Sequence, residues 1–267
     1  MRVALTIAGS DSSGGAGIQA DIKTFQAHGV FGMSAVTAVT VQNTQKVYDI
    51  QEMYPNIVHD QITCLFDDID IHAVKIGMVA SIELIQAIAK ALKTVKPPPV
   101  VLDPVMISKS GYHLLNQDAQ DALIQYLFPL AEVITPNIYE AQALIDRKIK
   151  SIDDMKSAAL EILKLGAKKV VVKGGHLKEN LATDILYDGQ EFKRLQSRWV
   201  ETKNTHGTGC TFSSAIAANI ALGKNFFEAV TLAKAYITGT IEHALSIGKG
   251  HGPTHHFFDL YAKAGFI

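Results

Sequence analysis

The chain has 267 residues, of which 48% are hydrophobic and 19% are charged, and its 25 basic side chains nearly balance 26 acidic ones. This composition is typical of a folded protein and argues against a disordered chain or a basic nucleic-acid-binding tail. No apolar run reaches the roughly 20 residues of a membrane span, and the first residues predict a buried strand rather than a signal peptide. Cys64 and Cys210 form neither a disulfide framework nor a zinc motif. We therefore expect a cytoplasmic protein with no membrane or nucleic-acid partner.

Short apolar runs alternate with longer segments of helical period, and this alternation is the main fold signal. In chain order we expect a strand over Val3–Ala8, a helix that carries Ile18, Ile22 and Phe25 and ends at Gly29, and strands over Ser34–Val41 and Val47–Met53. Next come a helix over Ile57–Phe66, a strand over Ala73–Ile76, a helix between Ser81 and the prolines 97–99, and a strand over Val100–Leu102. The rest consists of a helix over 117–128, a strand over Glu132–Thr135, helices over Ile138–Ile145 and from Ser151 to Leu165, a strand over Lys169–Lys173, a hairpin over 183–197, and helices over Thr208–Leu222 and Phe226–Ser246.

Five or more strand–helix units predict a largely parallel sheet with helices on both faces. No internal repeat or linker-like change in composition divides the chain, so we expect one domain over residues 1–267. Cys64 is expected in its core, on an apolar helix face with Ile62 and Leu65.

Ligands of such sheets bind beyond the carboxyl ends of the strands. Glycine-rich and polar segments stand at seven such places. They are Gly9–Gly17, Gln42-Asn43, Gly77-Met78, Asp103-Pro104, Thr135–Asn137, Lys173–His176 and Asn204–Cys210. We expect the chemistry of the protein at this edge of the sheet.

The strongest local signal is the stretch from His206 to Thr211, because it opens a predicted helix. Its glycines let several backbone N–H groups point at one spot, and the helix start adds about half a positive charge. This pattern suits a phosphate, although a plain helix start with glycines for close packing fits the spacing equally well. It is not a Walker loop, and Phe212 stands where the dinucleotide fingerprint needs a third glycine.

Other residues at the strand ends have two interpretations each. The Gly9–Gly17 loop lacks the Walker lysine, so ring packing and phosphate binding both remain open. Asn137 and Glu140 share one face of a helix start and suit a hydrated Mg²⁺, or else a helix cap with a solvated carboxylate. Lys173 suits a phosphate as a point charge, and Asp103 suits a hydroxyl, a magnesium-bound water or its own loop.

Cys210 lies at the predicted helix N-terminus, where the pKa of a thiol falls below its ordinary value of about 8.5. The helix start would make a thiolate accessible near neutral pH, whereas a bound phosphate nearby would oppose this lowering of the pKa, so the protonation state of Cys210 stays open. A nucleophile, a base and a filler remain open as its roles. His206 is a sequence neighbour of the kind that a cysteine hydrolase needs, but the surrounding phosphate-binding pattern favours a base.

Five stretches carry a family resemblance: LTIAGSDSSGGAGIQADIKTF (5–25), DPVM (103–106), TPNIYEA (135–141), VKGGH (172–176) and NTHGTGCTFSSAIAA (204–218). In the family's order and over nearly the whole chain, they resemble the hydroxymethylpyrimidine and phosphomethylpyrimidine kinases of thiamine synthesis, within the ribokinase superfamily. The resemblance implies a three-layer α/β/α sandwich with a mostly parallel central sheet. It also implies ATP as the phosphoryl donor, a small pyrimidine as the acceptor, and a homodimer.

The resemblance also implies residue roles. The stretch GTGC resembles the superfamily anion hole, formed by Gly207, Thr208 and Gly209, with Cys210 at the position of a catalytic Asp in sugar kinases. Asn137 and Glu140 match the element for magnesium and phosphate, and Lys173 matches the lysine near the ATP phosphates. The positions that align with the pyrimidine pocket are Gly9, Ala16, Gln42, Met78 and Val105.

Two positions bear on the choice of substrate. Gln42 is Glu in some relatives, and an amide can both donate to and accept from an aminopyrimidine edge. Residues 107–115 match a lid region in which some pyridoxal-phosphorylating relatives carry a Cys; this sequence has none there, which argues against pyridoxine or pyridoxal as the acceptor. That kinase remains the alternative within the superfamily.

The expected reaction has two steps. A hydroxymethyl group accepts the first phosphoryl group and benefits from a base, for which we expect Cys210, whereas the monophosphate that accepts the second is already largely ionised at pH 7. Two other classes remain open. A cysteine hydrolase would form a covalent intermediate without ATP, and a phosphate-binding module would bind nucleotide without turnover.

Overall fold

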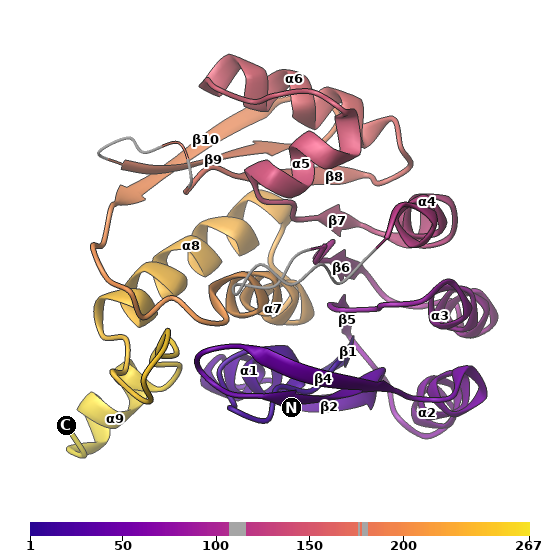
Figure 1. The fold of residues 1–267 in the computed structure, drawn as a ribbon, viewed down its shortest axis with the longest axis horizontal. Coiled ribbons are helices and arrows are strands. Elements are labelled where there is room, and N and C mark those ends of the chain that lie inside the picture. The colour runs from indigo at the N-terminus through magenta and orange to yellow at the C-terminus, as the bar shows by residue number, and fades with distance from the viewer. Residues whose placement is uncertain (107–115, 176, 178–180) are drawn as a thin grey trace.

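The computed structural model describes residues 1–106, 116–175, 177 and 181–267 (Figure 1). Its strands are β1 (Val3–Ala8), β2 (Phe31–Val36), β3 (Ala38–Gln42), β4 (Val47–Glu52), β5 (Ala73–Ile76), β6 (Val100–Leu102), β7 (Val133–Ile134), β8 (Lys169–Lys173), β9 (Leu181–Tyr187) and β10 (Phe192–Arg198). Its helices are α1 (Gly17–Ala27), α2 (Pro55–Asp68), α3 (Ile82–Val95), α4 (Gln117–Tyr126), α5 (Ile138–Ile145), α6 (Ile152–Leu163), α7 (Thr208–Ala221), α8 (Phe226–Glu242) and α9 (Phe258–Ala264), with a 3₁₀ turn over Phe128–Leu130.

Among the described residues, eight strands form the main sheet in the order β10-β9-β8-β7-β6-β5-β1-β2. Within this sheet, the six neighbouring strands β8, β7, β6, β5, β1 and β2 pair in parallel, and β9 and β10 add an antiparallel edge. Helices α2, α3 and α4 lie on one face of this sheet, while α1, α7 and α8 lie on the other (Figure 1). The three-layer α/β/α sandwich with a mostly parallel sheet is confirmed.

The strands read as continuous apolar runs because both of their faces are buried. In β8, for example, Val170 and Val172 pack into the core under α2–α6, whereas Val171 packs into the second core, under α1, α7 and α8. The same alternation holds in β6 and β5. Each helix layer thus has its own core, and the sheet lies between them.

The region predicted as one strand over Ser34–Val41 is two strands, and that prediction is wrong. Thr37 separates β2 from β3: its N–H donates to the carbonyl oxygen of Ala8 at 3.0 Å and its hydroxyl to that of Met78 at 2.8 Å. β3 then leaves the main sheet and pairs antiparallel with β4 as a separate two-stranded sheet. The expected short strand over Val47–Met53 is therefore confirmed as the partner of β3.

Two further expectations differ from the structure. Cys64 is exposed on α2 instead of buried with Ile62. Two positions on a helix differ by about 200° in direction, so these residues cannot share a face. The last segment also contains α9, which the sequence pattern did not indicate. Within the described part of the chain, no helix is both long and apolar enough to span a membrane.

Candidate active site

The strand order places the loop after β1 next to the loop after β5. From β1 the chain proceeds to β2 on one side, while β5 begins the run toward β8 on the other, so the order reverses between β1 and β5. Ligand crevices of open α/β sheets lie at such a reversal. Gly9 after β1 and Met78 after β5 are packed so closely that a Cβ at position 9 would clash with the Met78 methyl group. Two predicted pocket residues are therefore neighbours.

The other predicted pocket residues also lie at strand or helix ends. Ala16 is the N-cap of α1, and Val105 follows β6. Gln42 ends β3 and is bound to the β1 loop through Ser12. The Gln42 carbonyl oxygen accepts from the Ser12 hydroxyl at 2.7 Å, and the Gln42 N–H donates to the Ser12 hydroxyl oxygen at 3.0 Å. All three pocket residues are half-buried. The predicted lid, residues 107–115, and His176 lie outside the described residues.

The start of α7 faces the β1 loop. Its N-cap, Gly207, has a φ of +77°, and a Cβ there would clash with the carbonyl oxygen of Gly15. Glycine is thus required by both backbone conformation and space. The Thr208 hydroxyl donates to the carbonyl oxygen of Thr205 at 2.8 Å, so the Thr208 side chain does not cover the helix end. Residues 207–210 are partly buried but still reach the surface, with the partial positive charge of the helix beside them.

Asp103 and Lys173 meet beside this helix start. Lys173 Nζ lies 2.8 Å from Asp103 Oδ1, and a Cβ at Gly209 would lie 3.5 Å from Asp103 Oδ2 and 3.7 Å from Lys173 Nζ. Asp103 also accepts from the hydroxyls of Thr135 at 3.1 Å and Ser213 at 3.3 Å. Four of the predicted rim segments therefore converge at one point.

The charges of this cluster stabilise each other. Burial alone would raise the pKa of Asp103, but Lys173 and Lys75 outweigh it and lower that pKa. Burial alone would lower the pKa of Lys173, but Asp103 and Glu140 outweigh it and raise that pKa. Both groups are therefore charged at neutral pH, and a positive charge stands beside Gly209.

Asn137 and Glu140 form a complete capping box at the start of α5. The Asn137 N–H donates to Glu140 Oε2 at 2.7 Å, and the Glu140 N–H donates to Asn137 Oδ1 at 3.0 Å. Glu140 is only 6% exposed, so the alternative of a solvated glutamate is wrong. Burial, aided by the nearby Asp103 charge, raises the pKa of Glu140 to about 7 although Lys173 opposes this. The site thus holds a carboxyl group that a further cation would ionise.

The structure decides the direction of the Cys210 pKa, which the sequence left open. Burial raises the pKa of its thiol to about 11. Lys75 and the Gly17 N–H lower that pKa, while Asp21 and Asp103 raise it further. The helix start alone predicted a lowered pKa; the tertiary structure adds desolvation and two carboxylates, and these dominate. In this structure the neutral thiol prevails at pH 7.

A buried polar network that the sequence indicated only weakly lies near Cys210. Lys75 on β5 and Asp21 on α1 are both fully buried, and Lys75 Nζ lies 2.8 Å from Asp21 Oδ2. Asp21 also accepts from the hydroxyls of Thr6 and Ser214, each at 2.6 Å. Burial opposes the charge of Lys75, but Asp21 raises the pKa of Lys75 well above its usual range. An isolated Lys in an apolar strand was the only indication of this network.

The glycine loop after β1 is folded around its own Asp11. The carboxylate of Asp11 accepts from the N–H groups of Ser13 at 2.8 Å, Gly15 at 3.1 Å and Ala16 at 2.7 Å, and from the Ser13 hydroxyl at 2.7 Å. These amides are therefore already bound to a carboxylate. Between the two uses left open for this loop, the geometry favours ring packing over phosphate binding.

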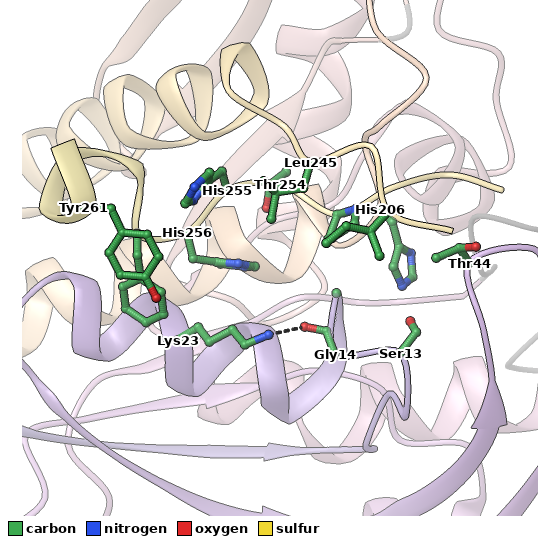
Figure 2. A pocket seen from close by; sticks show the side chains of 14 residues that line it. Ser13, Gly14, Lys23, Thr44, His206, Leu245, Thr254, His255, His256 and Tyr261 are labelled. Carbon is green, nitrogen blue, oxygen red and sulfur yellow. Dashed lines mark hydrogen bonds between the residues drawn. The ribbon is translucent and has the colours of Figure 1, made fainter. Parts of the chain in front are cut away.

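A cavity of about 250 Å³ lies behind this loop, between α1 and the segment that leads to α9 (Figure 2). Lys23 on α1 donates to the carbonyl oxygen of Gly14 at 2.8 Å from this side. His206 forms part of the same wall. Ser13, Gly14 and Gly15 of the loop line this cavity together with His206.

A second pair that the sequence pattern did not indicate supports the loop after β8. Asp184 on β9 accepts from the Gly174 N–H at 3.0 Å and pairs with Lys234 Nζ on α8 at 2.7 Å. A Cβ at Gly174 would clash with the carbonyl oxygen of Thr183. Long-range pairs of this kind leave no periodic signal in a sequence.

The family model described as phosphomethylpyrimidine kinase matches residues 11–255. The chain is 51% identical over 258 residues to the hydroxymethylpyrimidine/phosphomethylpyrimidine kinase of Rhizobium meliloti (strain 1021), covering 96% of this chain and 97% of that relative. It is also similar to the crystal structure of the phosphomethylpyrimidine kinase of Clostridium difficile 630, with 51% identity and a TM-score of 0.80 over 89% of this chain and 98% of the other.

A third similarity concerns the alternative substrate class. The ADP complex of Bacillus subtilis pyridoxal kinase is 42% identical, with a TM-score of 0.90 over 96% of this chain and 98% of the other. Neither a cysteine hydrolase nor a non-catalytic phosphate-binding module gains support from these similarities. The order of the strands, the glycine start of α7 and the full-length similarities agree: the chain belongs to the phosphomethylpyrimidine kinase family, whose members are phosphotransferases with a ribokinase-like fold.

Proposed function

We propose that the chain transfers the γ-phosphoryl group of ATP to 4-amino-5-hydroxymethyl-2-methylpyrimidine and then a second one to the resulting monophosphate, as a step of thiamine biosynthesis. One observation carries the proposal. The start of α7 and the Asp103–Lys173 pair converge at Gly209, and the start of α7 contacts the β1 loop, which holds the pocket positions Gly9 and Ala16. Both cores are built on one sheet, so we propose that residues 1–267 act as one kinase domain.

In this proposal the helix start stabilises the phosphoryl group during transfer. The transition state is loose and needs positioning and charge neutralisation more than covalent help. The backbone amides of Gly207, Gly209 and Cys210 provide fixed dipoles for that charge, and the Thr208 N–H, which makes a long bond of 3.4 Å to the Thr205 carbonyl oxygen, would turn to the phosphoryl group when it binds. Lys173 provides a full positive charge that Asp103 holds in place. These groups are oriented before substrate arrives.

We propose that Asn137 and Glu140 help to hold Mg²⁺ through water. No set of three His, Cys, Asp or Glu side chains gathers as a metal site in the described ranges, but Mg²⁺ in kinases needs only one or two carboxylates besides waters and phosphates. The raised pKa of Glu140 fits this use, because a cation nearby would favour its ionised form. The ion would neutralise charge on the donor phosphates.

Cys210 is the proposed base for the hydroxymethyl group. The support is positional: it follows Gly209 at the helix start, and Lys75 and the Gly17 N–H favour its thiolate. Its raised pKa means that the thiolate is scarce at pH 7, so this role predicts a rate that rises with pH. The monophosphate already carries an ionised oxygen and needs no such base.

We propose that the pyrimidine ring packs on the backbone of the β1 loop. Gly9, Ala16 and Met78 supply surface, Val105 a side wall, and the Gln42 amide supplies hydrogen bonds to the amino group and ring nitrogen. The occupied amides of the loop support this, since N–H groups already bound to Asp11 are not available to a phosphate.

One assay tests the proposal. ATP consumption is measured with the hydroxymethylpyrimidine, with its monophosphate and with pyridoxal, each in the presence of Mg²⁺. We expect turnover of both pyrimidines, and we expect the highest kcat/KM among the three substrates to belong to a pyrimidine and not to pyridoxal. Turnover of pyridoxal alone would contradict the proposal and favour the pyridoxal-kinase alternative. That alternative is retained because the Bacillus subtilis pyridoxal kinase structure has a TM-score of 0.90 to this chain.

We propose a homodimer as the working assembly. Its support is the family resemblance, together with apolar side chains exposed on the small β3–β4 sheet, where Val39, Val41 and Tyr48 are about half-exposed. Sedimentation at micromolar concentration tests this, and a species of one chain would contradict it.

We also propose a cytoplasmic location. Both cysteines are free, as is usual where disulfides are rare, and the proposed donor is ATP. Cell fractionation with an antibody tests this, and recovery in a secreted fraction would contradict it.

A further inference from the structure

We propose that Asp11 and His206 form a positioning clamp that fixes the pyrimidine-binding loop against the phosphate-binding helix start, and so sets how closely the acceptor hydroxyl approaches the phosphoryl group. This inference rests on the proposed function. Neither residue needs to touch substrate, since Asp11 is 2% and His206 is 7% exposed. They act through the loops that they join.

The two residues are 195 positions apart in the sequence and meet at the site. His206 Nε2 donates to Asp11 Oδ2 at 2.7 Å. Together with the Ser13, Gly15 and Ala16 donors, this makes five hydrogen bonds to one carboxylate. Burial would raise the pKa of Asp11, but the bonds from His206 and Ser13 lower it to about 2. The carboxylate is therefore ionised and fully engaged.

His206 is held from a second side. Its backbone N–H donates to the carbonyl oxygen of Gly252 at 3.1 Å, and the backbones of His206 and Pro253 form an isolated parallel β-bridge. Figure 2 shows its ring in the cavity wall, above Ser13 and Gly14. The C-terminal segment thus supports the histidine while the histidine supports the loop.

The loops have no room to slide past each other. A Cβ at Gly15 would clash with the His206 ring and lie 3.1 Å from Pro253 Cβ, and a Cβ at Gly207 would clash with the Gly15 carbonyl. Residue 207, next to His206, begins the anion hole, and Ala16, which donates to Asp11, lies in the ring pocket. A shift at the clamp therefore changes the relative position of acceptor and donor.

Such a shift is costly in phosphoryl transfer, because a misplacement of about 1 Å lowers a rate by about a hundredfold. Loss of the clamp should therefore lower kcat for the acceptor far more than it raises KM for ATP. A purely structural role predicts lower stability with kinetic constants unchanged in the molecules that remain folded.

The experiment compares four single variants and one double variant. His206→Leu removes the donor, whereas His206→Gln keeps an amide N–H that can reach Asp11. Asp11→Asn keeps the size but presents an NH₂ group to a ring of donors. His59→Leu is the matched control, because His59 has a comparable pair with Asp60 at 2.9 Å on exposed α2. Each variant is measured for kcat, for KM of both substrates, for ADP affinity and for the melting temperature.

We expect the wild type to turn over the pyrimidine, and kcat to fall tenfold or more in His206→Leu and Asp11→Asn. The ADP affinity of both variants should stay within about threefold of the wild-type value. His206→Gln should regain much of the kcat that His206→Leu loses. The double variant Asp11→Asn/His206→Leu should lose little more than Asp11→Asn alone, because the two residues act as one unit.

Equal kcat losses in the Leu and Gln variants, or an additive double variant, would overturn the clamp, as would a kcat within twofold of wild type in His206→Leu. Unfolding of both His206 variants would also overturn the clamp, since the Asp11–His206 pair would then be needed for folding and not for positioning the site. Wild-type inactivity on the pyrimidine would instead contradict the proposed function, and the same variants would then be compared on pyridoxal.

Discussion

Lys173 Nζ and Asp103 Oδ1 lie 2.8 Å apart at the ends of β8 and β6, directly beside Gly209 of the α7 start. Asp103 is 2% exposed and the Lys173 side chain 15% exposed. A lysine placed for phosphate would otherwise stand in a poorly solvated site without a counter-charge. The carboxylate lets the fold keep that charge in place before nucleotide binds.

Lys173→Met should destabilise the fold, because it leaves the Asp103 carboxylate buried without its lysine. Breaking a buried pair in this way costs about 3 kcal/mol or more, and urea unfolding measures it. The double variant Lys173→Met/Asp103→Asn should regain most of that stability but no kinase activity. The exposed pair of Lys168 with Glu132 at 3.0 Å provides the control: Lys168→Met should change stability by less than about 1 kcal/mol. An active double variant would contradict the role of Lys173.

Gly207→Ala should abolish most activity and lower stability. The new Cβ would be strained by the φ of +77° and would clash with the Gly15 carbonyl. Gly223→Ala is the matched control, because Gly223 has a φ of +85° but nothing within 4 Å of the added Cβ. We expect only the backbone cost of about 1–2 kcal/mol in the control, with kcat unchanged. Equal effects of both variants on kcat would show that the contact with Gly15 is unimportant.

Glu140 should make stability depend on pH in the range below neutrality. Its pKa is about 7 in the folded state, against an ordinary value of 4.5, so the folded state holds this proton more tightly. The stability that this proton contributes is present below about pH 4.5 and is lost as pH rises through 7. Relative to wild type, Glu140→Gln should therefore gain stability, on the order of 2 kcal/mol, between pH 5 and pH 8.

Magnesium provides the second half of this test. If Glu140 helps to hold the ion, MgADP should lower its pKa and reduce the pH dependence in wild type but not in Glu140→Gln. Thermal melting at several pH values, with ADP alone and with MgADP, measures both. An unchanged pH dependence in the presence of MgADP would exclude Glu140 from the metal site.

Cys210→Ala should slow phosphorylation of the alcohol more than that of the monophosphate, because only the alcohol needs a base. With a thiol pKa of about 11, about one molecule in ten thousand is a thiolate at pH 7. The alcohol step of the wild type should therefore rise as pH increases toward 10, and this rise should vanish in Cys210→Ala. Rates of both steps across pH measure this. Equal slowing of both steps would assign Cys210 to the shape of the anion hole.

The sequence allowed much of the fold to be predicted, for a physical reason. Parallel strands buried on both faces are short apolar runs between glycine, proline and polar residues, and the bounds of β1, β5, β6 and β8 match the prediction. The strand over Ser34–Val41 failed because Thr37 leaves the main sheet through hydrogen bonds to Ala8 and Met78, which are distant in sequence.

The sequence by itself determined most of the elements, the edge of the sheet where loops gather and the glycines that open α7, because these depend on local pattern and on backbone conformation. Only the tertiary structure decided that Asp11 meets His206, that Asp103 pairs with Lys173 and that Lys75 pairs with Asp21 near Cys210. It also decided that the Cys210 thiol is protonated and that Glu140 is poised near neutrality. Charge states depend on desolvation and on neighbours brought together from distant parts of the chain, and neither is encoded in the spacing of residues along it.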